Sequence, residues 1–282
     1  LKLSAGLRGD WFDYDIENRK LPAASTDYRD SVFTPKLGAV WSASPRLDLF
    51  ANVALGFRSP AAQQISPAGA AGPLGAAGGV VNDGISPSKV ESYDAGFVAL
   101  LASRWTATGA FFYTLNEDEI VQTAPNVFAS VGSTTRRGVE LESRVQLTPG
   151  LSAYASYTRL LQAEIDDAPV NSAFLLSVPR HQAKVGAEYD RPLGAGRLRL
   201  NADAYTTRGI PYFSGTPLRR LEVPSYVRYD LRAAWSVGRL EVAASAIVQP
   251  HLISEAFFAT AAGLFVSPQP REHYGFSFSY AY

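Results

Sequence analysis

Residues 274–282 read Tyr-Gly-Phe-Ser-Phe-Ser-Tyr-Ala-Tyr and end the printed chain. Successive side chains of a β-strand point to opposite faces, so this stretch predicts a strand with one entirely aromatic face. An edge strand of this kind would promote aggregation in a soluble protein, whereas in a closed barrel it would pair with the first strand. The aromatic positions are Tyr274, Phe276, Phe278, Tyr280 and Tyr282.

The same two-residue alternation recurs along the chain. In residues 46–58 the apolar positions Leu47, Leu49, Val53 and Leu55 interleave with charged and polar residues, and residues 139–147 and 197–204 behave alike. We expect about twelve strands of roughly ten or more residues, which is the length that crosses a bilayer at a tilt. Strands of soluble sandwiches are usually about five or six residues long. The pattern therefore predicts an all-β fold, a transmembrane antiparallel β-barrel.

Short and long connections alternate between the expected strands. The short ones lie at residues 44–45, 102–103, 148–150, 192–194 and 237–238. The long ones lie near residues 15–30, 59–89, 117–132, 163–178, 206–224 and 249–270. Short turns at one end and long loops at the other are typical of bacterial outer-membrane barrels, with the long loops extracellular. The Gly- and Pro-rich segment 59–89 could also link two domains, but the alternation continues on both sides, so we expect one sheet over residues 1–282.

Composition limits the classes of protein to which the chain could belong. Hydrophobic residues make up 46% and charged residues 18%, and the mean hydropathy is −0.04, which excludes a bundle of transmembrane helices but not a barrel. Lys+Arg and Asp+Glu both total 26, so there is no basic excess of the kind that nucleic-acid-binding proteins show. The charges on the polar faces, such as Glu140, Glu142 and Arg144, favour a wet lumen over a dry core.

Several short motifs, taken in order, resemble one family. They are Phe33-Thr34-Pro35-Lys36-Leu37-Gly38, Leu49-Phe50-Ala51-Asn52, Gly56-Phe57-Arg58-Ser59-Pro60, Glu91-Ser92-Tyr93-Asp94-Ala95-Gly96, Ala110-Phe111-Phe112-Tyr113-Thr114, Arg137-Gly138-Val139-Glu140-Leu141-Glu142, Val178-Pro179-Arg180-His181, Val223-Pro224-Ser225-Tyr226 and Tyr229-Asp230-Leu231-Arg232. Their order and spacing over nearly the whole chain resemble the barrel domain of TonB-dependent receptors. The aromatic final strand is similar to the signal that marks outer-membrane barrels for insertion.

This resemblance implies an active-transport receptor in the Gram-negative outer membrane. Its ligand would be a scarce compound, most often a ferric siderophore, and its energy would come from the TonB complex acting through a plug domain. Other implied partners are outer-membrane lipid, lipopolysaccharide and the barrel assembly machinery. Barrels of the family have about 22 strands. Because the chain starts at Leu1 inside an expected strand and shows no plug or Ton box, we expect it to be the C-terminal part of such a barrel.

The search for chemistry favours transport over catalysis. The three histidines, His181, His251 and His273, have no close metal-ligand spacing, and no nucleophile elbow or phosphate loop is found. We therefore expect no enzyme activity, no metal site and no cofactor.

Arginine and aromatic residues near the expected extracellular strand ends are the candidate ligand contacts, because anionic aromatic iron complexes suit guanidinium charge and ring faces. Each arginine could equally hold a lipid phosphate or another loop. The candidates are Arg58, Arg136, Arg137, Tyr212, Phe213, Arg219 and Arg220.

Two other functions stay open at this point. A self-contained barrel of about twelve strands could act as a passive porin or an autotransporter-type translocator, and its first strand would then pair with its last. A barrel hydrolase is the third reading, although no Ser/His pair on neighbouring strands supports it.

Overall fold

A computed structural model describes most of the chain. The described residues are 1–19, 22–66, 84–124, 127–166, 177–214, 219–250, 254–260, 263–268 and 270–281. Tyr282 and His251 therefore lie outside the described residues. Within this part of the chain, twelve strands form one antiparallel sheet, which confirms the predicted fold class and strand number.

The twelve strands of the main sheet are long and follow one another in chain order. They are β1 (Lys2–Ile16), β2 (Thr26–Ser44), β3 (Leu47–Arg58), β4 (Ser88–Ala102), β5 (Trp105–Ala124), β6 (Val127–Thr148), β7 (Leu151–Asp166), β8 (His181–Leu193), β9 (Gly196–Arg208), β12 (Tyr226–Val237), β13 (Leu240–Val248) and β16 (Glu272–Tyr280).

Smaller elements occupy the long connections. Two hairpins form separate two-stranded sheets, β10 (Ile210–Ser214) with β11 (Arg219–Val223) and β14 (Ser254–Thr260) with β15 (Gly263–Pro268). A 3-10 turn, η1 (Pro22–Ala24), and a short helix, α1 (Ala62–Ile65), complete the set. Among the described residues, no helix has the length and apolarity needed to cross a membrane.

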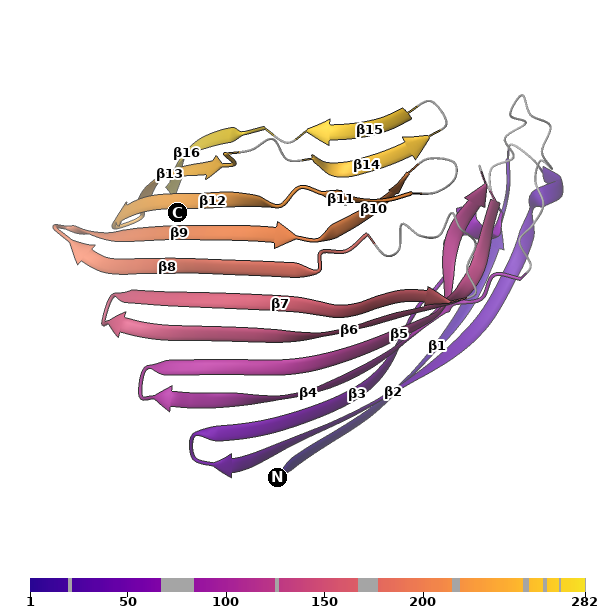
Figure 1. The fold of residues 1–282 in the computed structure, drawn as a ribbon, viewed down its shortest axis with the longest axis horizontal. Coiled ribbons are helices and arrows are strands. Elements are labelled where there is room, and N and C mark those ends of the chain that lie inside the picture. Colours follow the sequence, from indigo (N-terminus) through magenta and orange to yellow (C-terminus); the bar gives the residue numbers. More distant parts are fainter. Residues whose placement is uncertain are drawn as a thin grey trace.

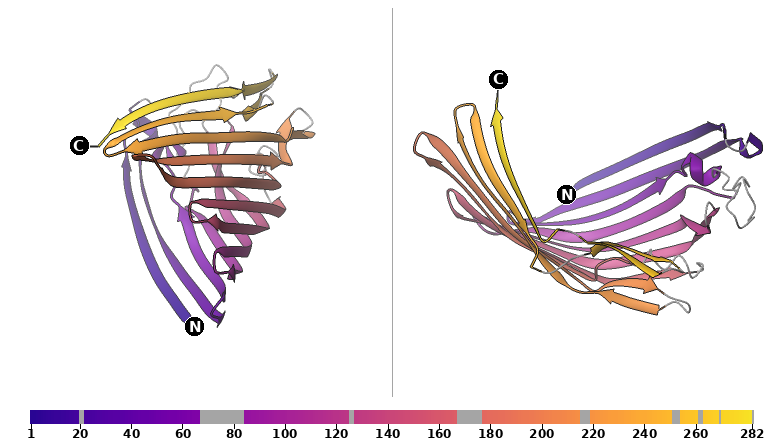
Figure 2. Two further views of the ribbon diagram at one scale, coloured as in Figure 1. Left: turned by 90° about the vertical axis from the view of Figure 1, so that its left-hand side faces the viewer. Right: turned by 90° about the horizontal axis from the view of Figure 1, so that it is seen from above.

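The main sheet is open and strongly curved. Figure 1 shows the strands side by side with β1 and β16 at the two edges, and Figure 2 shows the strong curvature of the sheet. Each strand pairs with the next in the sheet order, and no pairing joins β1 to β16. A self-contained closed barrel, which requires that pairing, is therefore not what these strands form.

All five predicted short connections are tight turns at the same end of the sheet. Each joins two paired strands through two residues that lie outside the strands, as at Pro45 and Arg46 between β2 and β3. Gly194 and Gly238 have φ of 59° and 55°, so these two turns use the left-handed conformation that glycine tolerates. The five predicted short connections are therefore confirmed.

The predicted loop at residues 117–132 is wrong. β5 runs to Ala124 and β6 starts at Val127, so these two strands extend beyond their neighbours as a long hairpin (Figure 1). The segment Glu117-Asp118-Glu119 is acidic and Asp118 takes a φ of 54°, but the pairing resumes at Glu119 in the same register. Pairing between β5 and β6 therefore extends the two strands through a segment whose composition is typical of a loop. The segments 206–224 and 249–270 likewise contain hairpins.

The two faces of the sheet differ as the alternation predicts. Side chains on the outward face include many exposed large apolar residues, among them Leu141, Val185, Leu231 and Trp235. In β16, Tyr274, Phe276, Phe278 and Tyr280 share this face and are 57–76% exposed. Exposure of this extent suits lipid rather than water.

Gly138 allows β6 to pass close to its neighbours. A Cβ at this position would lie 2.4 Å from the carbonyl oxygen of Arg159 and 2.6 Å from the ring of Phe112. The register of β6 against β7 also shifts between Arg137 and Gly138. The glycine is therefore required by close backbone packing beside a bulge.

We predict that Ala202→Arg in the middle of β9 destabilises the folded protein by about 2–4 kcal/mol, because Ala202 faces outward toward hydrocarbon. The matched control is Asn201→Arg, one residue away on the polar face, with an expected cost of about 1 kcal/mol or less. Urea titration of both variants in phospholipid vesicles measures the difference. Equal costs would contradict the assignment of the faces.

Candidate ligand-binding site

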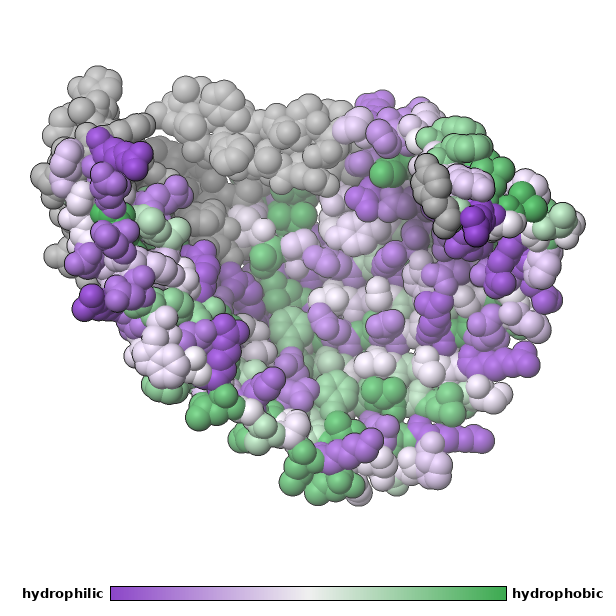
Figure 3. Space-filling model, turned by 180° about the vertical axis from the view of Figure 1, so that it is seen from behind, coloured by the Kyte–Doolittle hydropathy of each residue, from purple (hydrophilic) through white to green (hydrophobic). Residues whose placement is uncertain are grey.

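The concave face carries ion pairs between neighbouring strands. Arg144 pairs with Glu188 across β6, β7 and β8, while Glu241 of β13 pairs with both Arg199 and Arg232. Figure 3, viewed from behind, shows hydrophilic side chains spread over this side among hydrophobic ones. The pairs neutralise the inward charges, which leaves a polar wall suited to contact with water or a polar surface.

Tyr154 lies at the centre of this wall. Its hydroxyl donates to the carboxylate of Asp203, which also pairs with Lys184 at 3.2 Å. The guanidinium of Arg144 and the ammonium of Lys184 lie 5.5 and 5.3 Å from the centre of the tyrosine ring. Charge–ring contacts of this kind hold long cationic side chains against the wall.

A second polar cluster lies nearer the long-loop end. Asp118, whose φ is 54°, directly precedes Glu119, and the hydroxyl of Thr134 in β6 donates to Glu119 Oε1 at 2.7 Å. Asn116 Nδ2 donates to the same oxygen at 2.7 Å, and Arg136 lies 3.6 Å from it. Thr134 is 1% exposed. Arg136 is therefore held by a buried network rather than presented alone to the lumen.

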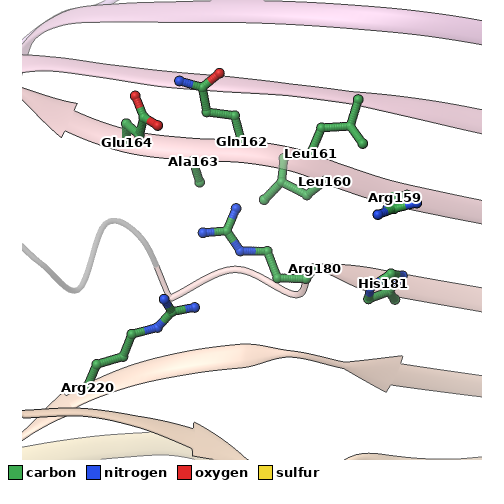
Figure 4. Close-up of a pocket in the computed structure, with 9 residues that line it drawn as sticks. All are labelled: Arg159, Leu160, Leu161, Gln162, Ala163, Glu164, Arg180, His181 and Arg220. Carbon is green, nitrogen blue, oxygen red and sulfur yellow. The ribbon is translucent and has the colours of Figure 1, made fainter.

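The wall is interrupted near the long-loop end between β7 and β8. Paired residues of these strands end at Arg159 and His181, although the amide of Leu160 still donates to the carbonyl of Arg180 at 2.9 Å. A cavity of about 330 Å³ occupies this position, bounded also by Arg220 of β11 (Figure 4). The other lining residues are Leu161, Gln162, Ala163 and Glu164.

Two arginines dominate the chemistry of this cavity. In Figure 4 the side chain of Arg180 points toward Leu160 and Ala163, and the side chain of Arg220 extends toward the same cavity from another strand. Burial and the positive charge of Arg220 lower the pKa of Arg180, and Glu164 offsets this in part. Neither arginine forms an ion pair within the described ranges. A bound anion would relieve the mutual repulsion, so the cavity suits an anionic group.

The predicted contact residues do not gather at one place. Arg220 lines the cavity, Arg58 donates to the carbonyl of Ile120 at 3.1 Å on the inner side, and Arg136 belongs to the Glu119 cluster. Arg137 faces outward, opposite to Arg136. The remaining three lie in the β10–β11 hairpin, where only the backbone is described: Tyr212, Phe213 and Arg219.

Sequence reasoning missed Arg180 as a site residue. It lies in the Val178-Pro179-Arg180-His181 motif that was used only as a family resemblance. Its position in the sequence could have indicated a site residue, because Arg180 directly precedes an expected strand and follows a long connection. Side chains at such positions line the mouth of a barrel. Within the described residues, no group of three or more acidic or histidine side chains could hold a metal ion.

Comparisons with known proteins agree on one family. The family described as "TonB dependent receptor-like, beta-barrel" matches residues 1–247. The probable TonB-dependent receptor BfrD of Bordetella pertussis is 27% identical over 84% of this chain and 33% of its own length. The ferrichrome outer membrane transporter/phage receptor of Escherichia coli is 27% identical over 86% of this chain and 30% of its own length. The chain thus spans about a third of these two relatives.

A solved structure supports the fold. The ferric yersiniabactin uptake receptor FyuA of Yersinia pestis superimposes with a TM-score of 0.68 at 16% identity, covering 91% of this chain and 38% of that one. The relatives are receptors and transporters by name rather than enzymes.

We predict that Thr134→Val destabilises the protein by about 1–3 kcal/mol, because it leaves the buried Glu119 cluster one hydrogen-bonding group short. The control is Thr135→Val, where the adjacent side chain faces outward. Denaturant unfolding monitored by tryptophan fluorescence compares the two. A cost for Thr134→Val no larger than that of the control would show that the cluster contributes nothing to stability.

Proposed function

The chain belongs to the family of TonB-dependent receptor β-barrels, and from this we propose that the whole protein is an outer-membrane receptor that takes up a ferric siderophore. A similarly scarce anionic metal complex would fit the same proposal. The observation that carries it is the arginine-lined cavity at the long-loop end of a charged, concave wall. Energy would come from the TonB complex, as the family implies.

The chemistry of the cavity favours an anionic ligand over a neutral one. Arg180 and Arg220 are adjacent cations that form no ion pair in the described part of the chain, although Glu164 lines the same cavity and offsets part of the positive charge. The guanidinium fork suits carboxylate or similar oxygens. Leu160 and Ala163 provide a small apolar surface beside them. Arg220 is one of the predicted contacts, and the roles of Arg58, Arg136, Arg137, Tyr212, Phe213 and Arg219 stay predictions.

We also propose that residues 1–282 are one unit, the C-terminal part of a larger barrel. The edges β1 and β16 carry backbone groups that need partners in hydrocarbon. Further strands of the same barrel would supply them. The polar concave wall would then face a plug domain through which the TonB complex acts.

The last strand supports a proposed role in assembly. Its aromatic side chains face outward together, as a signal read by the barrel assembly machinery would require. The same face would contact outer-membrane lipid and lipopolysaccharide.

A passive porin or translocator is less well supported. It would need the first and last strands to pair, and the sheet is open at both edges. A hydrolase has no support, because the relatives are receptors and transporters by name.

We predict that Arg180→Ala and Arg220→Ala each weaken binding of an anionic ferric siderophore about tenfold or more, because each removes a charged hydrogen-bond donor. Arg46→Ala at a short turn is the control and should leave binding unchanged. Tryptophan fluorescence titration of the protein from its complete reading frame, with a panel of ferric siderophores, gives the dissociation constants. If neither substitution changes the dissociation constant, the assignment of the cavity as the ligand site is overturned.

Energisation is tested separately in cells. A host that lacks its own receptor for the ligand should grow on the ferric siderophore when it expresses the protein, and deletion of the host TonB should abolish this growth. Growth that persists without TonB would support a passive channel instead.

A further inference from the structure

The long-loop end of β7 pairs with another strand on one side only. Its pairing with β6 continues to Asp166, whereas its pairing with β8 ends at Arg159, opposite His181. In the described part of the chain, no strand pairs with residues 161–166 on the side of β8. At about 3.3 Å per residue, this stretch is an edge of roughly 20 Å. Its backbone groups are therefore open to pairing with an added strand.

The cavity of about 330 Å³ runs along this edge rather than across one face of the sheet. Successive side chains of a strand point to opposite faces, so a cavity on one face would be lined by alternate residues. Instead, the consecutive residues 159–164 of β7 all line it. Arg180, His181 and Arg220 bound the cavity from the other side (Figure 4). The cavity is therefore a slot beside a strand edge, in the position that a further strand would occupy.

The charges along the slot depend on the face of the sheet. Ala163 faces the concave side, and Arg180 points toward it in Figure 4. Burial and the positive charge of Arg220 lower the pKa of Arg180, which places the two guanidinium groups near each other. The outward-facing charged residues of this part of β7 are of both signs: Arg159, Glu164 and Asp166. An added strand would thus meet two cations on its inner face and mixed charge on its outer face.

We propose that the slot binds an acidic ligand with an extended, peptide-like backbone, which adds to the edge of β7 as a further strand. Backbone hydrogen bonds to β7 would hold the ligand, and its inward carboxylates would pair with Arg180 and Arg220. The inference rests on the proposed function, because it uses the same cavity, and it names the class of ligand. That ligand would be a peptidic iron complex with free carboxylates, rather than one whose anionic groups all bind the metal.

The test uses the protein from its complete reading frame in neutral detergent and a fluorescein-labelled hexapeptide of alternating glutamate and threonine. An extended peptide directs alternate amides to opposite edges, so only one set of amides can pair with β7. Two methylated peptides of equal charge are compared, one methylated on the glutamate nitrogens and the other on the threonine nitrogens. Their dissociation constants, measured by fluorescence anisotropy, should differ by about tenfold or more, because only one peptide keeps its hydrogen bonds to β7.

The two arginines are tested with the unmethylated peptide. The double variant Arg180→Gln, Arg220→Gln should bind it about 100-fold more weakly, at about tenfold for each charged hydrogen bond that is lost. Glutamine in place of the peptide's glutamates should weaken binding to the parent protein in the same way, and the double variant should bind both peptides alike. The matched control, Arg46→Gln with Arg104→Gln at the short turns, should stay within about twofold of the parent.

Hydrogen exchange locates the added strand. The bound peptide should slow amide exchange in residues 161–166 by about tenfold or more, because new backbone hydrogen bonds protect this edge. Lysine at positions 180 and 220 should restore part of the binding, which excludes misfolding as the cause of the loss. Equal binding of the two methylated peptides, unchanged exchange in residues 161–166, or an equal loss in the control variant would each overturn the proposal.

The outcome is distinguishable from a failure of the proposed function. Peptide binding is measured without iron, and its main comparison is between two peptides of equal charge. A protein that binds a ferric siderophore but binds the two methylated peptides equally would keep the proposed function and lose strand addition. A protein that distinguishes the peptides but binds no ferric siderophore would keep the slot and lose the proposed iron complex.

Discussion

The backbone hydrogen bond in a medium without water is the constraint on which this fold depends. Hydrocarbon cannot satisfy an open amide or carbonyl group, so a membrane-spanning strand must be paired along both edges. The twelve strands of the main sheet meet this condition through one continuous antiparallel ladder, with bulges where the register shifts. The two outermost strands of this sheet, β1 and β16, each have one edge without a partner strand.

A fixed ladder also decides where each side chain can go. With pairing set, alternate residues face lipid or the concave side, so one strand can carry Leu200 outward and Asn201 inward without conflict. The charged side chains then differ between the two faces in whether they form ion pairs. Inside, carboxylates on neighbouring strands neutralise arginines, whereas outside and at the gap between β7 and β8 arginines lack protein partners in the described chain.

Much of the fold followed from sequence because the period of two and the turn residues are local properties. The five short turns, the number of long strands and the outward aromatic face of β16 were all predicted from them. The long hairpin of β5 and β6 was not, because its extension depends on pairing between the two strands, which keeps its register past the positive φ of Asp118. Local composition at residues 116–119 is acidic and indicates a loop, and only the partner strand reverses that preference.

The site was harder to predict for a related reason. Alternation assigns a side chain to a face, but it does not say which strands leave a gap or which charges find partners. Arg136 and Arg137 are neighbours in sequence and were given the same role, yet the ladder sends them to opposite faces, one to Glu119 and one toward lipid. Arg180 acquires its importance from the early end of the β7–β8 pairing and from Arg220 on another hairpin. A residue's function in this wall is thus set by register and by unpaired charge, both of which are properties of strand neighbours rather than of any motif.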